Sequence, residues 1–105
     1  MVNVGVLARF EVKPGLEQQV AEFFKEGLPL VEAQPSTTVW FAFRLGETSY
    51  GAFAAFANAQ DRAALLASGG PQLSRKYAHL FAEPPSFDEV DVLEARLSPA
   101  LGATP

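Results

Sequence analysis

The feature that most constrains the fold of this chain is the segment TTVWFAFRLGETSYGAFAAFA, residues 37 to 57, which has the pattern of a β-hairpin. Two apolar arms flank the polar turn GETS at residues 46–49. Successive side chains of a strand point to opposite faces of its sheet, and apolar residues occur at both kinds of position in each arm. The sheet that contains this hairpin therefore has two apolar faces, and helices on one side can cover only one of them.

The two faces of the first arm differ in character. One carries Val39, Phe41, Phe43 and Leu45, and the other carries Trp40, Ala42 and Arg44. The alternation does not say which of the two meets the helices, so each is a candidate for the uncovered face. The second arm, Tyr50 to Phe56, returns alongside the first.

A strand and a long helix precede the hairpin. Residues 2–12 alternate strictly, with valine, alanine and phenylalanine on one face, which predicts the first strand. The KPG triplet at 13–15 breaks the extended pattern, and apolar residues recur at helical spacing from Leu16 onward. Because proline lacks an amide hydrogen and crowds the preceding turn, we expect this helix to kink or stop near Leu28, just before Pro29.

Two shorter helices and a final strand are predicted after the hairpin. Asn58 has the position of a helix N-cap, and the pair Gly69–Gly70 is placed to end that helix. Pro71 is suited to the first turn of a third helix. The pair Pro84–Pro85 stops the helical pattern, and renewed alternation over residues 87–97 predicts the last strand.

This order of elements is strand, helix, strand, strand, helix, strand, the split β-α-β arrangement of the ferredoxin-like class. The sequence therefore predicts an α+β fold, βαββαβ, with a four-stranded antiparallel sheet in one domain over residues 1–97 and a frayed tail over residues 98–105. In this class both helical segments lie on one face of the sheet. We therefore expect a homodimer through the uncovered sheet faces. Burying several hundred Å² of apolar surface per partner contributes on the order of 10 kcal/mol before association costs.

Composition narrows the range of partners. The 105 residues include 8 Lys and Arg against 12 Asp and Glu, with no basic run that could neutralise a phosphate backbone, so no nucleic-acid partner is expected. The chain has no cysteine, which excludes disulfides and thiolate chemistry. It also lacks the pattern of a signal peptide and an apolar run of membrane-spanning length, so we expect a cytoplasmic protein without a membrane partner.

Three stretches carry a family resemblance: VKPG after the first strand, WFAFRL in the hairpin, and FANAQDRAALL after it. Together with the closing strand they resemble the antibiotic biosynthesis monooxygenase family of dimeric α/β barrels, over residues 3–97. That family includes oxygenases that oxidise polycyclic phenols without metal or flavin, quinol oxygenases, haem-degrading enzymes and members without an established activity. The resemblance implies a monooxygenase that needs no cofactor and acts on a small aromatic phenol or quinol.

The chain departs from the family at positions that matter for chemistry. Family members often carry a histidine in the helix after the hairpin, in a pattern similar to AHL, whereas the stretch here is Ala64, Leu65, Leu66. The haem-degrading branch uses that histidine together with an asparagine on the first strand and a tryptophan on the third. Asn3 matches the asparagine, but Phe53 or Phe56 stands where the tryptophan is expected, and the histidine is missing. Haem degradation is therefore disfavoured.

The candidate substrate-binding residues are Asn3, Arg9, Phe24, Trp40 and Arg44, which we expect around a cavity between sheet and helices. An indole can stack on an aromatic substrate, a guanidinium can hold a phenolate, and an amide can orient oxygen. The alternative interpretation places Trp40 in the dimer core and pairs both arginines with carboxylates at the sheet margin. No pattern identifies catalytic residues, and no cluster has the spacing of metal ligands.

His79 is the sole histidine and the tempting general base. It falls roughly 145° from the centre of the apolar stripe of its helix, so we expect it to face solvent. Without an evident base, a second function stands beside the monooxygenase: a non-catalytic dimeric module that binds a small molecule or serves in a stress response. The sequence does not decide between an enzyme and such a module.

Overall fold

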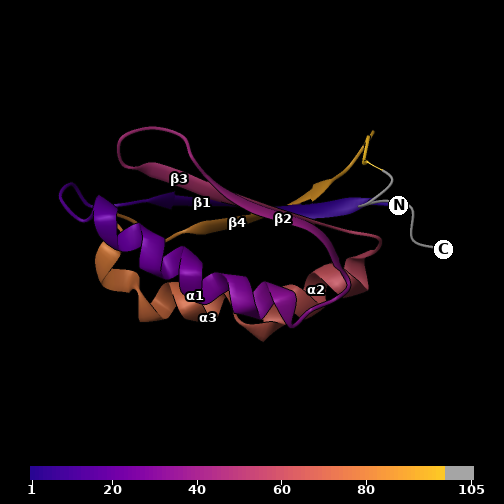
Figure 1. Ribbon diagram of the computed structural model, residues 1–105, viewed down its shortest axis with the longest axis horizontal. Coiled ribbons are helices and arrows are strands. Elements are labelled where there is room, and N and C mark those ends of the chain that lie inside the picture. The colour runs from indigo at the N-terminus through magenta and orange to yellow at the C-terminus, as the bar shows by residue number, and fades with distance from the viewer. Residues whose placement is uncertain (99–105) are drawn as a thin grey trace.

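One antiparallel sheet with strand order β2-β3-β1-β4 forms the centre of the computed structural model, which describes residues 1–98 (Figure 1). The elements are β1 (Val4–Glu11), η1 (Glu17–Gln19), α1 (Val20–Glu32), β2 (Thr37–Arg44), β3 (Ser49–Phe56), α2 (Ala59–Ser68), α3 (Gly70–Lys76), η2 (Ala78–Leu80) and β4 (Ser86–Asp91). This order confirms the predicted ferredoxin-like α+β fold. No helix among the described residues is both long and apolar enough to cross a membrane.

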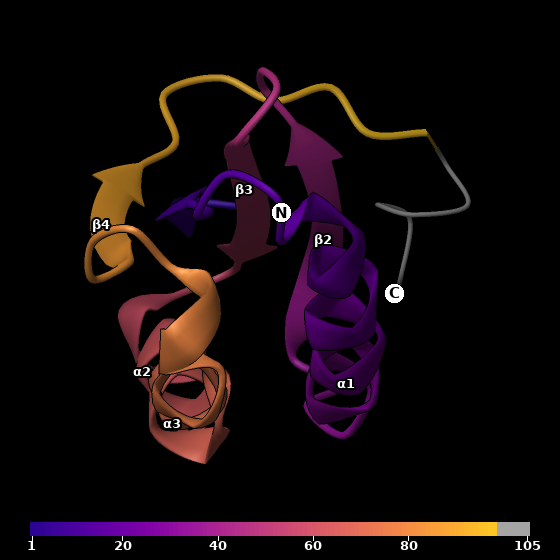
Figure 2. The ribbon, with the colours of Figure 1, turned by 90° about the vertical axis from the view of Figure 1, so that its left-hand side faces the viewer.

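All the helices lie on the same face of the sheet, with α1 beside the stacked pair α2 and α3 (Figure 2). The face that they cover carries the buried even-numbered side chains of β1, such as Ala8 and Phe10. Ala8 pairs with Ala52 of β3, which in turn pairs with Ala42 of β2, so these side chains share that face. Trp40, two residues before Ala42, therefore also points toward the helices.

Phe10 is the centre of the aromatic core between sheet and helices. Its ring centroid lies 5.1 Å from that of Phe23, 5.7 Å from those of Phe24 and Phe81, and 6.0 Å from that of Phe87. These rings come from β1, α1, the end of η2 and β4. Phe10 thus packs the sheet against α1 and against the segment that follows η2.

The opposite face of the sheet is open, which resolves the ambiguity of the hairpin. It carries the odd-numbered side chains Leu7, Val39, Phe41, Phe43 and Phe53. Phe41 is 51% exposed, and its ring centroid lies 6.0 Å from that of Phe53 and 6.3 Å from that of Phe43. We call these five residues the open face.

The first helix differs from its predicted bounds. It begins at Val20, after the 3-10 turn η1, and runs through Pro29 to Glu32. Of the two outcomes predicted near Leu28, a kink or a stop, the stop is therefore wrong. Pro29 and Lys25 are both exposed, so water can satisfy the Lys25 carbonyl that loses its helical partner. An interior proline is tolerated at such a solvent-facing position.

The start of the second helix is as predicted. Asn58 Oδ1 accepts a hydrogen bond from the Asp61 amide at 2.9 Å, which makes Asn58 the N-cap of α2. Gly69, at φ 158°, separates α2 from α3. The predicted stop at the glycine pair is therefore confirmed.

The last strand is shorter than predicted. Alternation extends to residue 97, but β4 ends at Asp91, whose partner Val4 is the first residue of β1. A strand needs a neighbour, and among the described residues the backbone pairing with the start of the chain continues past Asp91 only through the Val92 amide, which donates to the Asn3 carbonyl at 2.9 Å. The part of the predicted frayed tail from 99 to 105 lies outside the described residues.

Candidate functional site: an apolar cavity under the sheet

A cavity of about 90 Å³ lies between the helix-covered face of the sheet and the helices. Its sheet side is formed by Val6, Ala8, Phe10, Trp40, Ala52, Ala54 and Phe87. Its helix side is formed by Phe23, Phe24, Gly27, Leu30, Val31, Leu65, Leu66, Gly70 and Leu73. All four strands and all three α-helices thus contribute residues to its lining.

The cavity exists because small residues face each other across it. The side chains on the sheet side are short, since three of them are the alanines Ala8, Ala52 and Ala54. On the helix side, Gly27 of α1 has no side chain to fill the space. A Cβ atom built on Gly27 would lie 3.7 Å from Leu73 Cδ2, an ordinary contact distance. A methyl group at this position would therefore fit, and the space it would take is part of the cavity.

The lining is apolar throughout. None of the residues that form it is ionisable, and the indole N–H of Trp40 is the one side-chain hydrogen-bond donor among them. Such a site favours an apolar or aromatic ligand through burial of surface and contact between rings. It contains no side chain that could accept a proton from the ligand.

The structure brings together two of the candidate residues, Trp40 and Phe24, which both line the cavity. Arg9 does not join them, because it is an odd-numbered residue of β1, paired with Gly51 and Ser86, and lies on the far side of the sheet from the helices. The expectation that the face carrying Arg9 lines the same cavity as Trp40 is wrong. β3 lies between the strands of these two residues, and the observed pairing places the odd-numbered residues of β1 and the even-numbered residues of β2 on opposite faces of the sheet.

Arg44 and Asn3 are engaged elsewhere. Arg44 Nε donates to the Gly46 carbonyl and Nη2 to the Glu47 carbonyl, each at 2.7 Å, and its guanidinium lies 5.5 Å from the ring centroid of Tyr50. Arg44 thus closes the hairpin turn. Asn3 Nδ2 donates to the Ala57 carbonyl at 3.0 Å, which ties the N-terminus to the end of β3.

The alternative interpretation also fails in part. Trp40 cannot belong to the core of a dimer formed through the open face, because the helices cover its side of the sheet. His79 is exposed, as predicted, and its ring stacks on that of Tyr77 with centroids 6.1 Å apart.

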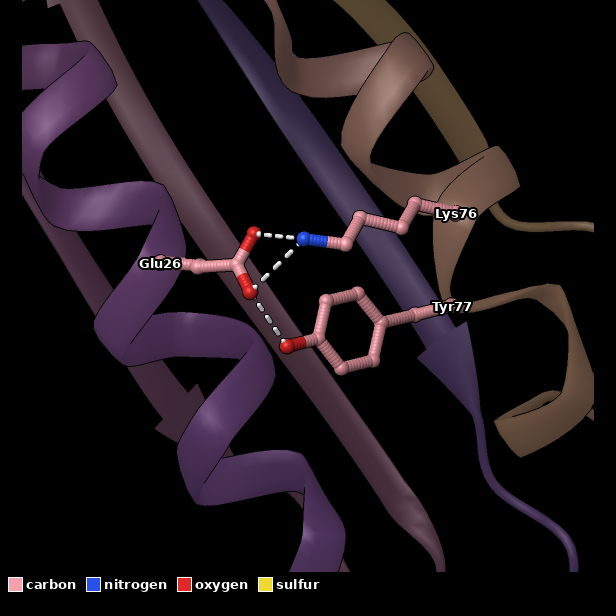
Figure 3. A network of polar contacts seen from close by, with 3 residues as sticks. All are labelled: Glu26, Lys76 and Tyr77. Atoms are coloured by element: carbon pink, nitrogen blue, oxygen red, sulfur yellow. Dashed lines mark hydrogen bonds and ion pairs between the residues drawn. The ribbon is translucent and has the colours of Figure 1, made fainter.

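An exposed polar cluster ties α1 to the end of α3 beside the cavity (Figure 3). The Glu26 carboxylate accepts hydrogen bonds from Lys76 Nζ at 2.8 and 3.1 Å and from the Tyr77 hydroxyl at 2.7 Å. The Lys76 ammonium and, after it, the Tyr77 hydroxyl lower the pKa of Glu26, whereas the same hydrogen bond raises the pKa of Tyr77. Since Glu26 precedes Gly27, this tie helps to set the distance between two walls of the cavity.

Sequence reasoning missed Gly27, although a signal was available. A glycine inside a helix costs about 1 kcal/mol relative to alanine, so its presence in the middle of α1 suggests a need for space. The run of alanines in β3 gave the same indication, and Ala52 and Ala54 do form the cavity. Ala55, of opposite parity, does not.

We compared the chain with protein-family models, curated protein sequences and solved structures to identify its family. No protein-family model matches the chain, and neither does any curated protein sequence. Among solved structures, the NE2512 protein of unknown function from Nitrosomonas europaea is 36% identical, with 93% of this chain and 96% of that one covered and a TM-score of 0.84.

Two further solved structures resemble the chain at low identity. SnoaB, a cofactor-independent oxygenase from Streptomyces nogalater, is 18% identical over 89% of this chain and 95% of its own, with a TM-score of 0.73. Another Nitrosomonas europaea protein, provisionally named an antibiotic biosynthesis monooxygenase, is 15% identical over 87% and 90%, with a TM-score of 0.75. The chain therefore belongs to one family with the NE2512 protein, and its fold is that of the antibiotic biosynthesis monooxygenases, as its sequence resemblance predicted.

Proposed function

We propose that the protein is a cofactor-independent monooxygenase that takes a small aromatic phenol or quinol into the cavity beneath its sheet. The observation that carries the binding step is the apolar lining of the cavity, in which the Trp40 indole N–H is the one side-chain hydrogen-bond donor. The reaction step is supported by the likeness in fold to SnoaB, a cofactor-independent oxygenase.

The size of the cavity limits the substrate. About 90 Å³ is less than the roughly 150 Å³ of an apolar cavity that holds benzene. A single ring fits only if half-buried side chains such as Phe24 and Leu30 move outward, and a fused polycycle requires much larger rearrangement. The proposed substrate is therefore a monocyclic phenol or hydroquinone.

The lining also limits the mechanism. Because it holds no proton acceptor and neither Arg9 nor Arg44 reaches it, the substrate must lose its phenolic proton to solvent at the mouth of the cavity. The ring then supplies electrons to O2. In a phenol, one oxygen atom of O2 forms a bond to the para carbon and replaces its hydrogen, the other leaves as water, and the product is a para-quinone. In a hydroquinone the new bond forms at a ring carbon that carries hydrogen, and the product is a hydroxyquinone. In both cases the ring is oxidised by four electrons and O2 is reduced by four.

The same absence of a proton acceptor favours a second candidate function. A non-catalytic module that binds a small aromatic molecule needs the apolar lining and nothing more. The two candidates predict the same binding and differ in whether O2 is consumed.

One experiment separates these functions. Trp40, the sole tryptophan, reports binding by fluorescence during titration with phenol, hydroquinone and naphthol. Saturable quenching by the monocyclic compounds, with O2 uptake and a quinone product in the absence of any cofactor, supports the monooxygenase. Quenching without O2 uptake supports the binding module, and fluorescence indifferent to every compound contradicts both. Gly27→Val, which fills the cavity, is the variant that must lose the response, and Gly46→Ala in the hairpin turn is its control.

We also propose that two chains form a homodimer through the open face. The support is an apolar patch of five side chains with no covering element among the described residues, one of them 51% exposed. Monomeric proteins rarely leave such a patch uncovered. Sedimentation at micromolar concentration is the test, and a monomeric peak there contradicts the proposal.

A further inference from the structure

A surface groove lies beside the apolar cavity, between α3, η2 and the start of β4. Its volume is about 460 Å³, whereas that of the cavity is about 90 Å³. Most of the residues that line it are apolar, among them Pro71, Ala78, Phe81, Pro85 and Phe87. Arg75 and Glu83 are the charged residues of its lining, one of each sign. We call this second space the groove.

Phe87 is the one residue, in the described part of the chain, that lines both the cavity and the groove. It lies on β4 opposite Ala8 of β1, so its side chain is on the helix-covered face of the sheet. A Cβ atom built on Gly70 would lie 3.9 Å from Phe87 Cε1, so the ring extends from β4 to the first residue of α3. The Phe87 side chain therefore forms a wall between the two spaces.

The rest of the partition is more tightly packed than Phe87. Phe81, which lines the groove, is buried, and its ring centroid lies 5.7 Å from that of Phe10 and 5.4 Å from that of Phe23. Phe87 is half-buried, and Phe10, at 6.0 Å between centroids, is its one aromatic neighbour among residues 1–98. Phe87 is therefore the part of the wall that a single substitution can open while the aromatic core stays in place.

We propose that Phe87 is a specificity-determining residue, which restricts the cavity to a single aromatic ring by separating it from the groove. This inference rests on the proposed function and adds the residue that sets the size of the ligand. A cavity of about 90 Å³ already needs outward movement of side chains to hold one ring, so a fused polycycle has no room while the wall stands. With Phe87 truncated, a three-ring phenol can place one ring in the cavity and the others in the groove.

Selectivity between phenols of different size tests the proposal. Isothermal titration calorimetry of the full chain gives the dissociation constants of phenol and of 2-hydroxyanthracene, a linear three-ring phenol. Wild type should bind phenol and exclude the three-ring compound, whereas Phe87→Ala should bind both. Since specificity is a difference of affinities, the measure is the ratio of the two constants, which should shift by about tenfold or more toward the three-ring compound.

Phe24→Ala is the matched control, because Phe24 is also a half-buried phenylalanine and lines the cavity but not the groove. It enlarges the cavity by one side chain without joining it to the groove, so the three-ring compound should stay excluded. Equal gains in Phe24→Ala and Phe87→Ala overturn the role of Phe87. Phe87→Val, whose β-branched side chain suits a strand, takes the place of Phe87→Ala if that variant does not fold.

The outcomes distinguish this inference from the proposed function. If wild type binds phenol but a folded Phe87 variant still excludes the three-ring compound, the role of Phe87 is overturned and the proposed function stands. The same conclusion follows if wild type binds the two compounds equally well. If neither wild type nor any variant binds either compound, the proposed function is contradicted, and the role of Phe87 with it.

Discussion

A Cβ atom built on Gly51 would lie 2.5 Å from Cε1 of Phe43, so the ring of Phe43 on β2 rests against the backbone of the glycine directly opposite on β3. A related contact occurs nearby, where a Cβ atom on Gly5 of β1 would lie 2.8 Å from the Ala54 carbonyl oxygen and 2.9 Å from Cζ of Phe53, a diagonal neighbour on β3. In both places a glycine makes room for an aromatic ring to lie over the strand.

Gly51→Ala should destabilise the fold by about 1–3 kcal/mol, because its methyl group displaces the Phe43 ring and meets the Ala8 carbonyl oxygen at 3.1 Å. Urea unfolding monitored by circular dichroism measures the change. Gly46→Ala, whose nearest contact is Ser49 Cβ at 4.0 Å, should cost much less. Equal stability of the two variants would show that the Phe43 contact is unimportant.

Phe41→Ser should weaken association of two chains without unfolding either one, because Phe41 is already 51% exposed in a single chain. Sedimentation velocity over a concentration series gives the dissociation constant. Leu28→Ser is the matched control, since Leu28 is 44% exposed but lies on α1, on the other side of the molecule from the open face. If Leu28→Ser weakens the dimer as much as Phe41→Ser does, the interface is not the open face.

Gly27→Ala should stabilise the protein and weaken ligand binding in the same variant. Replacing a helical glycine by alanine contributes about 1 kcal/mol, which for a domain of this size raises Tm by roughly 4–8 °C. The added methyl group takes space from a cavity of about 90 Å³. Calorimetry and Trp40 fluorescence measure the two effects. Weaker binding in a more stable protein excludes unfolding as the cause, whereas unchanged quenching would mean that the ligand lies elsewhere.

Glu26→Gln should lower stability at neutral pH and have less effect in acid. Lys76 and Tyr77 lower the pKa of Glu26 below its ordinary value of 4.5 in the folded chain. A group with a lowered folded pKa contributes stability that is complete above the unfolded pKa and is lost as pH falls through the folded pKa. The difference in Tm between wild type and Glu26→Gln should therefore shrink below pH 4.5. Glu47→Gln, in the exposed hairpin turn, is the control, and a gap between wild type and Glu26→Gln that is constant with pH contradicts the prediction.

Much of the fold follows from local patterns in the sequence. Three features that depend only on neighbouring residues were predicted correctly. They are the strict alternation in β1, the polar turn between β2 and β3, and Asn58 as the N-cap of α2. The predicted bounds failed where the surroundings of a segment decide. β4 ends at Asp91, opposite the first residue of β1, and Pro29 stays inside α1 because it faces solvent.

The order of elements, the two apolar faces of the hairpin and the exposed position of His79 follow from the sequence. Which face meets the helices follows from the packed structure, and with it the positions of Trp40 and Phe24 in a cavity and of Arg9 on the far side of the sheet. Alternation along one strand separates its residues into two sets, one for each face of the sheet, but does not identify the set that faces the helices. The register of pairing between strands decides which residues of each strand share a face with those of its neighbours. That register is set by pairs that are distant in the sequence, such as Ala8 with Ala52 and Ala42 with Ala52.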